Sequence, residues 1–176
     1  TVPHFEKMLY DNALIPEVYI SAYQLTGEEK YLNVVRETFE FIEREMEHPS
    51  GVFYSSLDAR SEGEEGKFYL WEPSEIRKIL ENERARKIFL EYYGLTEKGN
   101  FEGKNVLRIK KSKKKLASKY GIEADEIENI LDEARKKVLK VREERTRPLR
   151  DEKILSGWNG LMISSLARGA RVLGKY

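Results

Sequence analysis

The stretch that decides the fold reads Thr26-Gly-Glu-Glu-Lys-Tyr-Leu-Asn-Val-Val-Arg-Glu-Thr-Phe-Glu-Phe-Ile-Glu-Arg-Glu-Met-Glu47. Its apolar residues recur at intervals of three and four, as they do on one face of an amphipathic helix. These residues are Leu32, Val35, Phe39, Ile42 and Met46. Thr26 and Glu29 stand at the spacing of a capping box, which predicts that the helix begins there. The pattern therefore predicts a helix over 26–47 and favours a mainly α fold.

The residues before this helix predict a second helix that turns back on the first. The stripe that indicates it consists of Ile15, Val18, Ala22 and Leu25. Gly27 stands where a chain leaving one helix would reverse into the next. Pro16 lacks an N–H, so the first helix either begins near Asn12, with Pro16 in its first turn, or is kinked at Pro16. Together the two helices would form a helical hairpin.

The middle of the chain changes character. Residues 52–57 and 67–71 have strand-like patterns and enclose an acidic loop, which predicts a small β-hairpin near 52–71. Two short helices follow, the first beginning at Pro73 and the second ending at Gly94. The clearest helix covers 124–145. The sequence therefore predicts a mainly α protein with a small β-hairpin.

The end of the chain repeats its beginning at a constant offset (159 − 12 = 147). The repeated positions are Asn159, Leu161, Met162, Val172 and Gly174, which align on Asn12, Leu14, Ile15, Leu25 and Gly27. In the first copy the glycine leads into a return helix, whereas the chain stops at Tyr176 after the second. We therefore expect an incomplete helical-hairpin protein whose last helix leaves apolar surface exposed. Such a chain is expected to form a two-fold homodimer.

Composition excludes several classes of protein. Of 176 residues, 40% are hydrophobic and 36% are charged, which is typical of a globular protein with a strongly ionic surface. The net charge of +1 gives no overall attraction to nucleic acid or anionic lipid, and the lysine-rich run 110–115 is interpreted as a solvated face. Cysteine is absent, so disulfides and thiolate chemistry are excluded. No apolar stretch approaches the roughly 20 residues of a membrane span, and we expect a cytoplasmic protein.

The first candidate for chemistry lies near the start of the chain. Spacings of three and four would place His4, Lys7 and Asp11 on one helical face, with Glu6 and Asn12 beside them. A histidine and a carboxylate together can move protons near neutral pH. The alternative interpretation is a charged helix end with ordinary ion pairs.

The second candidate is the acidic loop that contains Asp58, Glu62 and Glu65 and is flanked by aromatic residues. Carboxylates beside aromatic rings resemble the wall of a sugar site, where one acid protonates a leaving oxygen and another acts as base or nucleophile. A solvated hairpin tip is the alternative. A calcium loop is excluded because Arg60 and Tyr69 stand where two calcium ligands are required.

The third candidate is Trp158 with Asn159, next to a polar segment. A tryptophan there can stack on a sugar ring, although filling a core is the commoner use. The sequence leaves both interpretations open.

Four motifs in order carry a resemblance that extends over nearly the whole chain. They are Val2-Pro-His-Phe-Glu-Lys-Met-Leu-Tyr-Asp-Asn-Ala13, Phe53-Tyr-Ser-Ser-Leu-Asp-Ala59, Ser61-Glu-Gly-Glu-Glu-Gly-Lys-Phe-Tyr69 and Lys153-Ile-Leu-Ser-Gly-Trp-Asn-Gly-Leu-Met-Ile163. With them the chain resembles the thioredoxin-fused, N-acylglucosamine 2-epimerase-like family, which includes spermatogenesis-associated thioredoxin-like proteins. The resemblance implies that residues 1–176 are part of an (α/α) toroid of the six-hairpin glycosidase type. The thioredoxin-like domain and the remaining hairpins would then lie outside this chain.

The resemblance also implies a set of residues lining a central cavity. The expected catalytic residues are His4, Asp11, Asp58 and Glu62, and the expected substrate-binding residues are Glu6, Lys7, Asn12, Glu65, Trp158 and Asn159. No metal and no cofactor is implied. The family pattern Asp-Ala-Asp-Ser-Glu departs here at Arg60, which replaces an acid with a cation. Related epimerases use two histidines as acid and base, and only His4 matches in this chain.

These features predict a fragment of a carbohydrate-active epimerase, isomerase or hydrolase that binds a sugar-like small molecule. The isolated chain is expected to be inactive, because a toroid cavity needs hairpins from all around its ring. The alternative function is a non-catalytic scaffold that presents client proteins to a fused thioredoxin-like domain.

Overall fold

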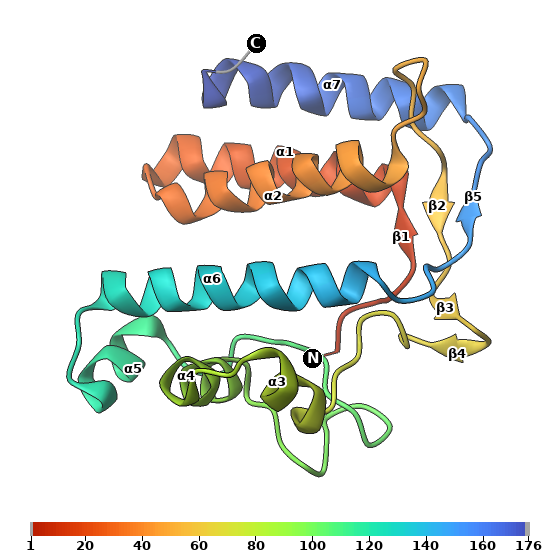
Figure 1. Ribbon diagram of the computed structural model, residues 1–176. Coiled ribbons are helices and arrows are strands. Elements are labelled where there is room, and N and C mark those ends of the chain that lie inside the picture. Colours follow the sequence, from red (N-terminus) through yellow and green to blue (C-terminus); the bar gives the residue numbers. More distant parts are fainter. Residues whose placement is uncertain (1, 175–176) are drawn as a thin grey trace. The chain divides into compact units, whose positions relative to one another are not determined.

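The computed structural model describes residues 2–174, which form seven helices and five two-residue strands (Figure 1). The described chain divides into two compact units. The hairpin unit consists of residues 4–60 and 148–174, and the middle unit of residues 2–3 and 61–147. The protein is therefore mainly helical, as predicted, and each unit has its own core.

The hairpin unit contains three helices and a small antiparallel sheet. Its elements are β1 (Lys7–Met8), α1 (Leu9–Thr26), α2 (Glu29–Met46), β2 (Ser56–Leu57), β5 (Arg150–Asp151) and α7 (Ser156–Leu173). β2 is the central strand, with Lys7 opposite Leu57 on one side and Asp151 opposite Ser56 on the other. The sheet thus ties the start of α1 to the segment that leads into α7.

Helix α2 confirms the helix that the apolar periodicity predicted. All five residues of the expected stripe are buried: Leu32, Val35, Phe39, Ile42 and Met46. Gly27 ends α1 with a φ of 69°, a left-handed conformation that glycine adopts without strain. The predicted capping box is wrong. Thr26 is the last residue of α1, and its Oγ1 accepts a hydrogen bond from the Glu28 N–H at 3.2 Å.

Helix α1 does not bury the predicted stripe. Its buried residues are Leu9, Ala13, Pro16 and Ile20. The predicted residues Ile15, Val18 and Leu25 are 48%, 69% and 87% exposed. The helix begins at Leu9 and not near Asn12, so Pro16 lies inside it and faces the core. Two stripes of comparable hydrophobicity compete on this helix, and packing against α2 and α7 decides which one is covered.

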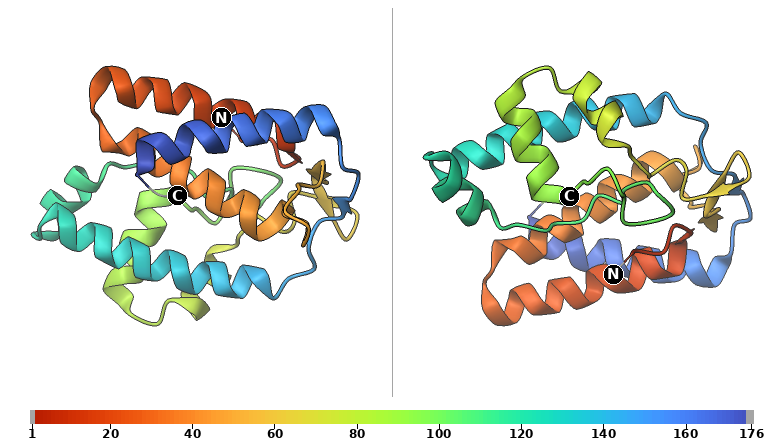
Figure 2. Two further views of the ribbon diagram at one scale, coloured as in Figure 1. Left: turned by 90° about the horizontal axis from the view of Figure 1, so that it is seen from above. Right: turned by 90° about the horizontal axis from the view of Figure 1, so that it is seen from below.

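Helices α1 and α7 are structural copies of one another. Both contain 18 residues, and their bounds differ by the 147 residues of the sequence repeat (156 − 9 and 173 − 26). Both end at a left-handed glycine, Gly27 in one case and Gly174 in the other. They lie side by side and run parallel (Figures 1 and 2). Tyr10 meets Trp158 near their starts and Glu17 pairs with Arg168 further along.

The close approach of α7 to α2 depends on the absence of a side chain at Gly169, because a Cβ there would collide with the buried ring of Phe39. We expect Gly169→Ala to lower the free energy of unfolding by about 1–3 kcal/mol, the usual cost of overpacking. Gly160→Ala is the matched control, since nothing lies within 4 Å of the added methyl group. It should stabilise the helix by up to about 1 kcal/mol. Urea unfolding of both variants checks this, and equal effects would contradict it.

The middle unit contains four helices, and its core includes the buried side chain of Trp71. Its elements are β4 (Glu64–Glu65), α3 (Pro73–Ile79), α4 (Glu83–Tyr93), α5 (Lys113–Tyr120) and α6 (Ala124–Glu143), and β3 (Arg60–Ser61) stands at the junction of the two units in the sequence. The predicted helices near Pro73, Gly94 and 124–145 are confirmed. The predicted β-hairpin is present only as the short pair β3–β4. Residues 67–69 form turns instead of a strand, and Trp71 makes an isolated antiparallel bridge with Asn105.

The lysine-rich run is ordered in a way that the sequence did not indicate. Its second half begins α5, and two of its lysines pair with carboxylates: Lys113 with Glu128 and Lys111 with Glu91. Lys119, further along α5, also pairs with Glu91. Tyr120 also donates to Glu91, at 2.9 Å. Hydrogen bonds from Lys111 and Lys119 lower the pKa of Glu91 to about 2. Burial, with the Glu91 hydrogen bond, raises the pKa of Tyr120 to about 12.

The Glu91 cluster predicts a pH dependence of stability. The carboxyl has a pKa of about 2 when folded and about 4.5 when unfolded, so its stabilisation is present above pH 4.5 and is lost as the pH falls toward 2. Glu91→Gln should therefore be less stable than the wild type at pH 7, and the difference should shrink between pH 4.5 and 2. Glu81→Gln is the control, because it removes one exposed charge elsewhere. The difference in stability between this variant and the wild type should stay constant over the same pH range. Urea midpoints across this pH range provide the measurement.

Within residues 2–174 we find no helix that combines the length and the apolar character required of a membrane span.

Candidate functional site

The parallel helices α1 and α7 bring an aromatic pair together at their N-terminal ends. Tyr10 and Trp158 meet edge to face with ring centroids 4.9 Å apart, and both are partly exposed. Asp11 and Asn12 follow Tyr10 in the first turns of α1, with Asp11 exposed. We call these four residues the helix-start site. Of the ten residues that the sequence singled out, it contains Asp11, Asn12 and Trp158.

The segment before α1 is not helical, so the prediction that His4, Lys7 and Asp11 share a helical face is wrong. Lys7 lies in β1 and its Nζ donates to the carbonyl oxygens of His4 and Phe5, at 2.9 Å in both cases. This lysine thereby holds the segment in its bend. The side chains of His4 and Glu6 are exposed.

Asn159 is a buried structural residue. Its Oδ1 accepts a hydrogen bond from the Phe53 N–H at 2.8 Å, and its Nδ2 donates to the Phe53 carbonyl at 2.9 Å and to the Leu155 carbonyl at 3.2 Å. The amide therefore binds the main chain of Phe53, which lies 106 residues earlier in the sequence. Asn12, its counterpart in the repeat, makes the same local bond, from Nδ2 to the Met8 carbonyl at 2.7 Å.

The two asparagines predict unequal effects of the same substitution. Asn159→Ala leaves the buried N–H and carbonyl of Phe53 without partners, so we expect a loss of roughly 2–4 kcal/mol in the free energy of unfolding. Asn12→Ala removes one hydrogen bond at a partly exposed position and should cost about 1 kcal/mol or less. Chemical denaturation of the two variants side by side checks the contrast. An Asn12 variant as unstable as the Asn159 variant would disprove it.

Asp58 lies at the exposed end of β2. Its Oδ1 accepts a hydrogen bond from the Arg60 N–H at 2.8 Å, a local turn in which the side chain satisfies the backbone. Its own N–H donates to the Leu149 carbonyl at 2.8 Å and extends the pairing of β2 with β5. Asp58 thus keeps an exposed carboxylate while it shapes the turn.

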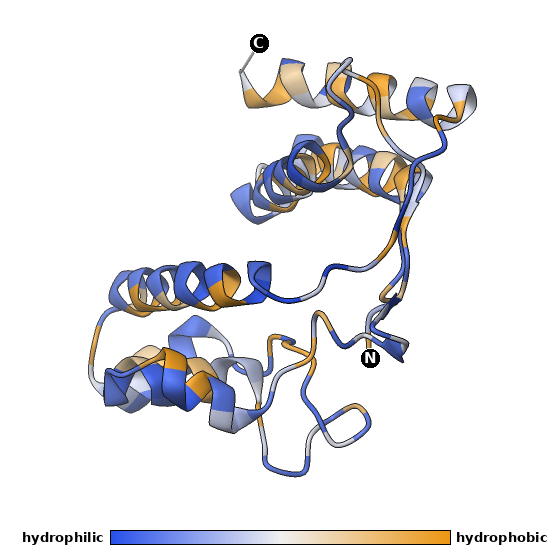
Figure 3. Cartoon of the chain, turned by 45° about the vertical axis from the view of Figure 1, so that its right-hand side comes forward, coloured by the Kyte–Doolittle hydropathy of each residue, from blue (hydrophilic) through white to orange (hydrophobic). Residues whose placement is uncertain are grey.

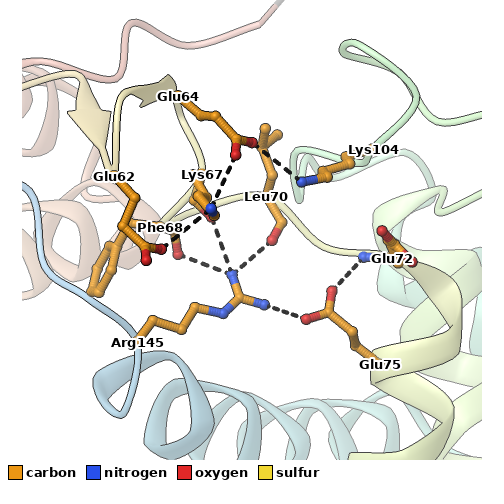
Figure 4. Close-up of polar contacts among 9 residues, drawn as sticks. All are labelled: Glu62, Glu64, Lys67, Phe68, Leu70, Glu72, Glu75, Lys104 and Arg145. Carbon is orange, nitrogen blue, oxygen red and sulfur yellow. Dashed lines mark hydrogen bonds and ion pairs between the residues drawn. The ribbon is translucent and has the colours of Figure 1, made fainter.

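Glu62 and Glu65 belong to the middle unit, whereas the other eight predicted residues belong to the hairpin unit. Glu62 pairs with Lys67 at 3.3 Å, and the same lysine pairs with Glu64 at 3.0 Å (Figure 4). Lys104 reaches Glu64 at 3.7 Å. Glu62 and Glu65 are exposed. This geometry is that of a solvated, ion-paired hairpin tip, which was the alternative interpretation of the acidic loop.

Arg145 is an anchoring residue that sequence reasoning did not single out. Its guanidinium donates to the carbonyls of Phe68 and Leu70 at 3.1 and 2.7 Å and pairs with Glu75 at 2.8 Å (Figure 4). It also stacks 3.8 Å from the ring centroid of Trp71, which is 1% exposed. Arg145 therefore fixes residues 68–75 against the end of α6. A single arginine after a helix gives no sequence signal for such a role.

The middle unit also carries a groove of about 390 Å³ between α6 and the α3–α4 region. Its lining residues are Leu80, Asn82, Arg84, Ala85, Glu126, Ile130, Glu133, Ala134 and Lys137. None of them was predicted as a site residue. Across residues 2–174, no group of three or more histidine, aspartate or glutamate side chains is arranged to hold a metal ion.

The fold and these residues define a protein built on a helical hairpin whose first helix is repeated at the end of the chain. The chain is homologous over nearly its whole length to spermatogenesis-associated protein 20. It is 35% identical to the human protein over 99% of this chain and 34% identical to the rat protein over 98%. An uncharacterized protein of Caenorhabditis elegans is 29% identical over 95%.

The chain spans about a quarter of the length of these relatives, 25% for the two mammalian proteins and 26% for the nematode one. No protein-family model matches the chain. The resemblance to N-acylglucosamine 2-epimerases and the toroid architecture therefore stay predictions.

Proposed function

We propose that the hairpin unit forms one wall of a binding site for a sugar-like small molecule. The observation that supports this proposal best is the Tyr10–Trp158 pair, which two parallel helices hold at their N-terminal ends and which Asp11 and Asn12 follow on α1. Aromatic faces bind the apolar face of a sugar ring, and carboxylates and amides bind its hydroxyl groups. The helix-start site offers both kinds of group.

The chemistry that we propose is proton transfer on that sugar, as in an epimerase, isomerase or hydrolase. Asp11 is an exposed carboxylate that follows Tyr10 in the first turn of α1, and His4 is an exposed imidazole on the segment that leads into α1. In this proposal they are the proton carriers, with Asp58, the residue after β2, as a third. Lys7 and Asn159 then serve as positioning residues, because their polar atoms are already bound to the protein main chain.

We propose that this chain supplies only part of the site and is inactive by itself. The supporting observations are the exposure of His4, Asp11 and Asp58 and the length of the homologous proteins, of which the chain matches about a quarter. Groups from the remainder of a longer protein would complete the cavity.

Trp158 gives this proposal a direct test, because the chain has two tryptophans and the other, Trp71, is buried. A saccharide that binds at the helix-start site should change the fluorescence of the wild type and of Trp71→Phe, but not that of Trp158→Phe. The measurement is a titration with a panel of monosaccharides and N-acylated amino sugars. Asp11→Asn should weaken the response, since the carboxylate accepts stronger hydrogen bonds than an amide. A panel without any saturable, Trp158-dependent change would sink the proposal.

We also propose that copies of this chain associate. The support is the apolar surface that α1 and α7 leave exposed, which includes Val18, Leu25 and Ile163. Exposed apolar faces of this kind mark protein interaction sites. The sequence predicted a two-fold homodimer as the simplest arrangement of the copies.

A further inference from the structure

Asn159 and Gly160 form the one Asn-Gly pair in the sequence. In an unfolded chain this pair is chemically labile, because glycine has no side chain to shield its backbone nitrogen from the neighbouring amide. The nitrogen of Gly160 attacks Cγ of Asn159 and closes a succinimide ring, and Nδ2 leaves as ammonia. Water then opens the ring at either carbonyl, which leaves aspartate or its isomer isoaspartate. The net reaction converts an amide and water into a carboxylic acid and ammonia, and it needs no enzyme.

In the folded chain the same pair is held in a geometry that blocks the attack. Both residues lie in α7, whose backbone dihedral angles are fixed, whereas ring closure requires the backbone to rotate at Asn159. The side chain is fixed as well, because Oδ1 accepts from the Phe53 N–H at 2.8 Å and Nδ2 donates to the Phe53 carbonyl at 2.9 Å. Asn159 is also only 7% exposed, so water has little access to it. Helix, hydrogen bonds and burial together protect the amide.

From this arrangement we propose that Asn159 is a spontaneous deamidation site that the fold keeps closed, and that its conversion makes unfolding of the hairpin unit irreversible. Protection is weakest at the start of α7, where the N-cap residue Leu155 makes no side-chain capping bond. Gly157 and Gly160 lie in the first turns, and glycine lowers the stability of a helix. Each opening of this helix start exposes the amide, so the rate of deamidation follows the population of the open state.

The product does not fit the place that the amide occupied. Nδ2 of Asn159 donates to the carbonyls of Phe53 and Leu155, at 2.9 and 3.2 Å. A carboxylate has no proton to donate, so after deamidation a negative charge faces these carbonyl oxygens in the interior. The surroundings are apolar: hydrophobic positions recur along α7, the helix that leads to the C-terminal label in Figure 3, and Phe53 and Met162 belong to the core. Isoaspartate fits less well still, because it adds a methylene group to the main chain of the helix.

Gly160 is not required by the packing of α7. It is exposed, it is absent from the glycines with positive φ, and an added Cβ would meet nothing within 4 Å. In the repeat, Asn12 is followed by Ala13, so the same helix start accepts a residue with a side chain after its asparagine. Gly160→Ala therefore removes the labile pair and leaves the hydrogen bonds of Asn159 in place.

The first experiment compares the wild type with Gly160→Ala at mildly alkaline pH, in buffer and in guanidinium chloride. Samples are refolded by dilution at intervals, and peptide mass spectrometry follows the gain of one mass unit at Asn159. The wild type should lose the amide more than an order of magnitude faster in denaturant than in buffer, and its refolded fraction should fall in step with that loss. Gly160→Ala in denaturant should keep both the amide and its ability to refold several-fold longer.

The second experiment tests the product directly with Asn159→Asp, and Asn159→Ala is the matched control. At neutral pH both should be less stable than the wild type, because both lose the bond from Nδ2 to Phe53. Burial raises the pKa of the introduced carboxyl above its unfolded value of about 4. The protonated carboxyl donates to the Phe53 carbonyl again, and this stabilisation is complete below the unfolded pKa and lost as the pH rises through the folded one. The urea midpoint of Asn159→Asp should therefore rise relative to that of Asn159→Ala as the pH falls.

Several results would overturn the proposal. Deamidation at Asn159 that is as fast in buffer as in denaturant would mean that the fold does not protect the amide. Reacted chains that refold with wild-type stability, or an Asn159→Asp variant as stable as the wild type at neutral pH, would mean that the product fits. An equal loss of refolding in the wild type and in Gly160→Ala would place the damage elsewhere in the chain. An Asn159→Asp variant that stays unfolded at neutral pH while Asn159→Ala folds supports the proposal.

Discussion

The side chain of Asn159 makes the interaction on which the hairpin unit depends. It pairs with both polar groups of the Phe53 main chain, and so joins α7 to the segment that follows α2. The N–H and carbonyl of Phe53 lie outside any helix and are buried, and an unpaired backbone group in the interior costs free energy. One amide side chain satisfies them both. Two further contacts join the end of the chain to this part of the molecule: β5 pairs with β2, and Gly169 of α7 lies against Phe39 of α2.

This constraint explains why several predicted site residues have structural duties. Asn159, Lys7 and Asp58 all bond to the main chain at the places where the hairpin unit is assembled. The motifs that contain them therefore contribute to the folded structure, whatever chemistry they also perform. The helix-start site differs, because Tyr10 and Trp158 remain partly exposed and Asp11 has its carboxylate toward solvent. Its side chains are therefore accessible to a ligand.

Different kinds of interaction stabilise the interior of each unit. The hairpin unit relies on apolar packing of three helices and on main-chain pairing, with few charges in its seams. In the middle unit, Glu91 and Arg145 each gather several partners from separate segments. Such networks explain the lysine-rich run, whose charges the folded chain partly neutralises with Glu91 and Glu128 instead of presenting them together.

The sequence by itself determined the helices with one dominant apolar stripe. The 3,4 rhythm identified α2 and α6, and the constant offset of 147 identified α7 as a copy of α1, because these patterns are local or can be read by alignment. It could not decide which stripe of α1 is buried, since Ile15 and Val18 are as apolar as the residues that face the core. Nor could it assign Asn159 to Phe53, or Arg145 to Trp71, because those pairs are far apart in the chain. Only the tertiary structure decided them, because burial is set by what packs against a residue and not by the residue alone.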